Sequence, residues 1–125
     1  MRYYDELARL EREGFDIIVD KTWEDLPIRD LFDDTCHDIR ELERKVDAGI
    51  YEWFMLRVRV FVDGLEMGSH YLGGCMYEDA REVLVDGTAE DCIYEAVKEA
   101  QGRVWPLMRR LQAINETMER EAVCG

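Results

Sequence analysis

Residues 50–77 read IYEWFMLRVRVFVDGLEMGSHYLGGCMY, and this stretch decides the fold. Its apolar side chains recur at every second position from Phe54 to Val62. A period of two is typical of a β-strand that lies with one face on a hydrophobic core. The run ends at Asp63-Gly64, a pair that favours a two-residue type I′ turn because both positions need a positive φ. The stretch therefore predicts a β-hairpin whose second strand begins at Leu65.

The two-residue turn also predicts which residues pair across the hairpin. Counting outward from the turn places Val60 opposite Met67 on the buried face and Arg57 opposite His70 on the outer face. The outer face would then combine basic and aromatic side chains, as many binding surfaces do, unless a helix covers it. The predicted outer-face binding residues are Trp53, Arg57, Arg59, Phe61 and His70.

Around this hairpin the sequence predicts a single α+β domain over residues 1–125. We expect an antiparallel sheet of two to three strands, centred on the 51–72 hairpin, with residues 15–20 as the third strand, packed by four to five helices. The helices are expected at residues 3–13, 33–48, 78–86 and from residue 89 onward. Gly102 and Pro106 should kink or break the last of these near Trp105. Residues 118–125 are expected to be a frayed tail.

The net charge of −13 over 125 residues excludes some classes of partner. Nucleic acid and anionic membranes would be repelled, so neither is expected to bind directly. No run approaches the roughly 18 apolar residues that a membrane helix requires. The charged N-terminus does not resemble a signal peptide, so we expect a cytoplasmic protein, or one of the host cytoplasm if a phage encodes it.

Few residues point to catalysis or to a bound metal. The four cysteines form no CxxC pair, so we expect buried free thiols. A zinc site built from Cys36, His37, His70 and Cys75 would match no standard ligand spacing. We therefore assign no catalytic residue, metal or cofactor and expect a protein that is not an enzyme. A small metal- or thiol-dependent enzyme is one alternative.

Acidic side chains are concentrated in two groups on the predicted helices. Asp91, Glu95 and Glu99 recur at every fourth position, which places carboxylates about 6 Å apart along a helix. Such a row on a folded domain can imitate a phosphate backbone, although a solvated helix face gives the same pattern. The predicted acidic contact residues are Glu78, Asp79, Glu82, Asp91, Glu95 and Glu99, together with Asp34, Asp38 and Glu41.

These features favour a non-catalytic module that binds a basic protein surface, for example on a nucleic-acid-processing complex. A small acidic chain without catalytic motifs is similar in general character to phage-encoded counter-defence inhibitors and other nucleic-acid mimics. The second hypothesis is an assembly protein that dimerises through its C-terminal helix. Its seam would be Leu107, Leu111, Ile114 and Met118, at 4-3-4 spacing. Packing of the same seam on the sheet is the other explanation of that spacing.

Overall fold

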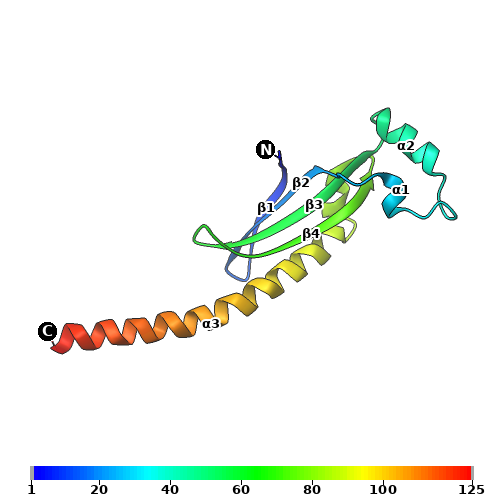
Figure 1. Ribbon diagram of the computed structural model, residues 1–125. Coiled ribbons are helices and arrows are strands. Elements are labelled where there is room, and N and C mark those ends of the chain that lie inside the picture. The colour runs from blue at the N-terminus through cyan, green and yellow to red at the C-terminus, as the bar shows by residue number, and fades with distance from the viewer. Residues whose placement is uncertain (1, 125) are drawn as a thin grey trace.

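The computed structural model describes residues 2–124 as an α+β structure with one antiparallel sheet (Figure 1). The four strands follow one another in space as they do in sequence, in the order β1-β2-β3-β4. The elements are β1 (Asp5–Arg12), β2 (Phe15–Trp23), α1 (Ile28–Leu31), α2 (Ile39–Asp47), β3 (Glu52–Val62), β4 (Leu65–Tyr77), the 3₁₀-helix η1 (Ala80–Leu84) and α3 (Thr88–Cys124).

The hydrophobic core lies between one face of the sheet and the first half of α3. Alternate residues of β2 and β3 point into it, as the period of two predicts, and α3 packs chiefly on β4 and β3. The buried face of α3 consists of Ala89, Cys92, Ile93, Ala96, Val97 and Ala100. The expected third strand is confirmed as β2, which buries Phe15, Ile17 and Val19.

The expected sheet of two to three strands is wrong, because the first predicted helix is strand β1. Glu13 and Gly14 have φ of 54° and 85°, so together they form a two-residue turn, and Arg12 pairs with Phe15 across it. From sequence, Gly14 resembled the left-handed residue that ends a helix. The same positive φ also serves a tight hairpin, and pairing with β2 decides in favour of the strand.

The predicted hairpin register is correct only beside its turn. Val62 pairs with Leu65, but a bulge follows and Val60 then pairs with Gly68 rather than with Met67. An extra residue in one strand moves the side chains that follow it to the opposite face, here as far as a second irregularity between Leu56 and Phe54. His70 therefore lies opposite Val58, on the face that α3 covers, and the predicted pair of Arg57 with His70 is wrong.

Helix α3 approaches β4 closely at Gly68. A Cβ atom added there would lie 2.8 Å from the backbone nitrogen of Ala100 and would collide with the carbonyl oxygen of Ala96. The small residues on both sides let the helix backbone rest directly on the strand. This contact fixes the position of α3 relative to the sheet.

The expected four to five helices are also wrong, since the described residues contain three α-helices. Helix α2 begins at Ile39, later than predicted, because the carboxylate of Asp38 caps it by accepting a hydrogen bond from the Glu41 N–H. Helix α3 runs through Gly102 and Pro106 without the predicted break and curves gently (Figure 1). Proline removes one hydrogen bond of a helix, and the turns on either side here remain helical. None of the helices in residues 2–124 has the length and apolar composition of a membrane span.

Candidate functional site

The second half of α3 lies outside the folded domain. Val104 is the last residue of the helix that packs against the core, and every residue from 105 to 123 is exposed. Figure 1 shows this part of the helix, in orange and red, extending past the end of the sheet. We call residues 105–124 the distal segment.

An apolar stripe runs along the distal segment. The predicted seam residues are exposed by 38% at Leu107, 54% at Leu111, 47% at Ile114 and 60% at Met118, and Met108 beside them is exposed by 54%. Packing on the sheet therefore does not explain their 4-3-4 spacing.

The stripe continues the buried face of α3. Ile93, Val97, Ala100 and Val104 precede Leu107 at the same alternating spacing of four and three, and residues at this spacing share one side of a helix. The sheet covers this side as far as Val104 and leaves the remainder uncovered. One continuous helix face is thus part of the core at one end and open to solvent at the other.

The acidic side chains of α3 and the preceding loop are partly neutralised. Asp91 and Glu95 are exposed, but Glu99 pairs with Arg103 at 3.1 Å. Near the loop, Asp79 pairs with Arg81 at 3.1 Å, and hydrogen bonds from Arg81 lower the pKa of the Asp79 carboxyl. The remaining members of this set, Glu78 and Glu82, are exposed.

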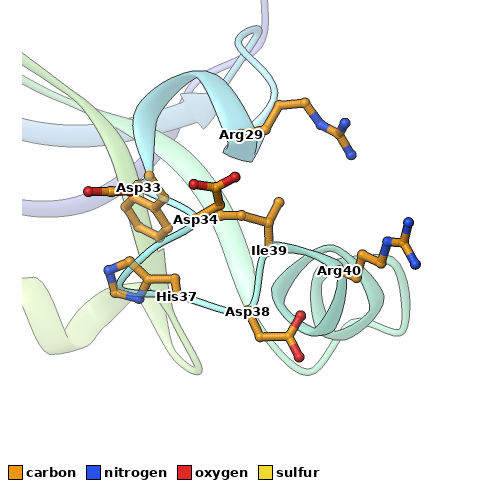
Figure 2. A pocket seen from close by; sticks show the side chains of 8 residues that line it. Arg29, Asp33, Asp34, His37, Asp38, Ile39 and Arg40 are labelled. Atoms are coloured by element: carbon orange, nitrogen blue, oxygen red, sulfur yellow. The ribbon is translucent and has the colours of Figure 1, made fainter.

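The second acidic group does not form one surface. Asp38 caps α2, and the guanidinium of Arg44 donates hydrogen bonds to Glu41 that lower the pKa of that carboxyl. Figure 2 shows the side chains of Asp34 and Asp38 pointing in different directions around a depression at the start of α2. His37 stacks there on Phe32, with the ring centroids 5.1 Å apart. Carboxylates that diverge in this way do not reproduce a row of phosphates.

The two arginines of the outer hairpin face share one buried carboxylate, that of Asp20, which was not among the predicted site residues. The carboxylate of Asp20 on β2 is 3% exposed and accepts hydrogen bonds from Arg57 at 2.8 and 2.6 Å and from Arg59 at 3.3 Å. These hydrogen bonds raise the pKa of the Arg57 guanidinium. The ring of Tyr4 covers Arg57, with its centroid 3.4 Å from the guanidinium carbon. An acid on the strand next to two outward-facing arginines was the signal available in the sequence.

The other predicted outer-face residues have separate surroundings. The indole of Trp53 donates a hydrogen bond to the Leu26 carbonyl and meets the ring of Phe32 edge-on. Phe61 lies beside Arg59, and the bulge in β4 places His70 on the opposite face. The five residues therefore do not make one continuous binding surface.

The cysteines and histidines do not gather into a site. Cys75 and Cys92 are buried and Cys36 is exposed, whereas the side chain of Cys124 lies outside the described residues. Burial raises the pKa of the Cys75 thiol to about 11, which makes it a poor nucleophile near neutral pH. Across residues 2–124, no three His, Cys, Asp or Glu side chains are grouped as metal ligands would be.

Comparison with protein-family models, curated proteins and solved structures finds no match to this chain. The distal segment has the clearest physical signature, because its apolar stripe belongs to a face that is buried elsewhere on the same helix.

Proposed function

We propose that this chain is an assembly protein that forms a homodimer through the distal segment of α3. The observation that carries the proposal is the exposed stripe of Leu107, Leu111, Ile114 and Met118, in line with the buried face of the same helix. Two such stripes can pack against each other as interlocking side chains, in the manner of a short coiled coil.

The physical argument concerns the stability of the helix itself. A helix shorter than about 12–15 residues is marginal in water, and longer ones gain most of their stability from packing an apolar face. The distal segment has an apolar face, but within the described residues none of its side chains packs against the core, because the contacts of α3 with the core end at Val104. Pairing with a second copy would bury the apolar face of the distal segment and so supply the contact that this part of the helix lacks.

Sedimentation equilibrium over a range of protein concentrations tests the proposal. The wild-type chain should be a dimer that dissociates on dilution. Replacing Leu111 and Ile114 by Glu should give a monomer, because the charges would be buried in the interface. The matched control replaces Ala113 and Val123, which lie off the stripe, by Glu and should stay dimeric with the same added charge. A wild-type chain that is monomeric at every concentration overturns the proposal.

A nucleic-acid mimic that binds a basic protein surface is a second candidate function. It is supported by the exposed carboxylates of Asp91 and Glu95 and by the formal charge of −14 on residues 1–101, which contain 26 of the 29 acidic and 12 of the 16 basic residues. The test measures binding to a nucleic-acid-processing complex at increasing salt, with Asp91→Lys and Glu95→Lys as the variant. Binding that neither salt nor the variant weakens would rule out this function.

A further inference from the structure

We infer that two copies of the distal segment pair in antiparallel orientation, which places the two sheet domains at opposite ends of the dimer. The inference rests on the proposed homodimer and specifies how its two helices meet. It is carried by two independent observations, the order of charges along the helix and the charge of the domain at its base.

The charges along this part of α3 are separated by sign. Arg109 and Arg110 lie in the first half of the distal segment, and residues 102–115 contain no acidic residue. The last turns carry Glu116, Glu119 and Glu121, with Arg120 as the one basic residue. A parallel pair would bring arginines beside arginines and glutamates beside glutamates. An antiparallel pair brings each basic half beside the acidic half of its partner, and complementary charges set the orientation of paired helices.

The seam fits the same arrangement. If the twofold axis passes between Gln112 and Ala113, Leu107 of one copy faces Met118 of the other, and Leu111 faces Ile114. Every layer of the interface then contains one seam residue from each helix. In this register the C-terminal end of each helix stops near residue 101 of its partner, where the sheet domain begins, so the overlap uses the exposed length of α3 (Figure 1).

The charge of the sheet domain favours the same orientation. Residues 1–101 carry a formal charge of −14. A parallel pair would set two such domains side by side. An antiparallel pair separates them by the length of the distal segment, about 30 Å for 20 residues at 1.5 Å each. This is several times the screening length of about 8 Å at physiological ionic strength, so the domains repel each other little.

Disulfide cross-linking of two variants that each carry one added cysteine in the seam tests the orientation. The background replaces Cys36 and Cys124 by Ser and keeps the buried Cys75 and Cys92. Into it are placed Leu107→Cys in one sample and Met118→Cys in another. In the antiparallel dimer the two copies of residue 107 are roughly 16 Å apart along the helix, too far for a bond that needs Cβ atoms about 4 Å apart. Each variant alone should therefore stay unlinked under mild oxidation, and the mixture should form a disulfide-linked heterodimer.

The outcomes separate this inference from the proposed function. Cross-linking of each variant to itself shows a parallel pair and overturns the inference while the homodimer stands. A dimer by light scattering that links neither alone nor in the mixture overturns the inference as well. A chain that is monomeric by light scattering overturns both.

The response to salt gives a second measurement on the wild-type chain. Attraction between unlike halves should weaken the antiparallel dimer as sodium chloride is raised from 0.05 to about 0.5 M, because salt screens exposed charges. Like halves in a parallel dimer repel, so that dimer should tighten over the same range. A dissociation constant that falls with salt therefore contradicts the antiparallel arrangement.

Discussion

Arg57 and Asp20 form a two-pronged ion pair across β3 and β2, with Nε–Oδ1 and Nη2–Oδ2 distances of 2.8 and 2.6 Å. The two residues are direct partners in the sheet register, and both side chains are largely buried, 12% and 4% exposed. Such a pair gives the outer face of the sheet a fixed polar centre.

We expect Asp20→Ala to destabilise the fold by about 3–5 kcal/mol, the range found when one partner of a buried ion pair is removed. The loss leaves Arg57 without its carboxylate and also removes the contact of Arg59. Urea unfolding monitored by circular dichroism measures this change in the free energy of unfolding. The control, Asp16→Ala, changes an exposed acid on the same strand and should leave the midpoint in place. Equal midpoints for the two variants would show that the pair contributes nothing.

Gly68→Val should destabilise the domain by at least about 1–3 kcal/mol, the usual cost of overpacking a core. The new side chain would collide with the backbone of α3 at Ala96 and Ala100, which cannot yield as a side chain can. Thermal unfolding of the variant and of the wild-type chain measures this loss of stability. Gly102→Ala is the control, because its Cβ meets nothing within 4 Å, and alanine in a helix interior should instead add roughly 0.5–1 kcal/mol.

Cys75 makes the stability depend on alkaline pH. Its folded pKa is raised to about 11 from the usual 9.0, because burial disfavours the thiolate. Above pH 9 the unfolded chain loses this proton first, so the folded state loses relative stability up to about pH 11. The loss should approach roughly 2–3 kcal/mol, two pKa units at about 1.4 kcal/mol each.

Comparison with Cys75→Ala isolates this effect, since other groups also titrate in the same range. The difference in unfolding free energy between wild type and variant should shrink as pH rises from 8 to 11. A difference that stays constant over this range contradicts the assigned pKa.

Hydrogen exchange should divide α3 into two parts at Val104. The part of the helix formed by residues 92–104 packs on the core, so its backbone amides should exchange slowly at any protein concentration. Amides of residues 107–120 should exchange quickly in dilute protein and become protected as the concentration rises, because pairing stabilises the exposed helix. Protection that does not change with concentration would mean that the distal segment is stable by itself.

Local chemistry predicted some elements well. The alternation from Phe54 to Val62 predicts strand β3 and its buried face, because a core on one side imposes a period of two. The Asp63-Gly64 turn and the pairing of Val62 with Leu65 follow from the need for a positive φ. The seam from Leu107 to Met118 is also visible as spacing alone.

The predictions for other elements were wrong because the same local sequence pattern is compatible with two structures. Residues 3–13 can form a helix or a strand, and only pairing with β2 selects the strand. The bulge beside Met67 leaves no mark in the alternation of apolar residues, yet it moves His70 to the other face of the sheet.

The sequence by itself determined the α+β class, the central hairpin, the acidic charge and an amphipathic C-terminal helix, because each depends on neighbouring residues or on a sum over the chain. Only the tertiary structure decided that Asp20 neutralises Arg57 and that the seam of α3 is uncovered. The first depends on which strands are neighbours. The second depends on where the sheet ends, and the spacing of Leu107, Leu111, Ile114 and Met118 is the same whether or not a sheet lies beneath it.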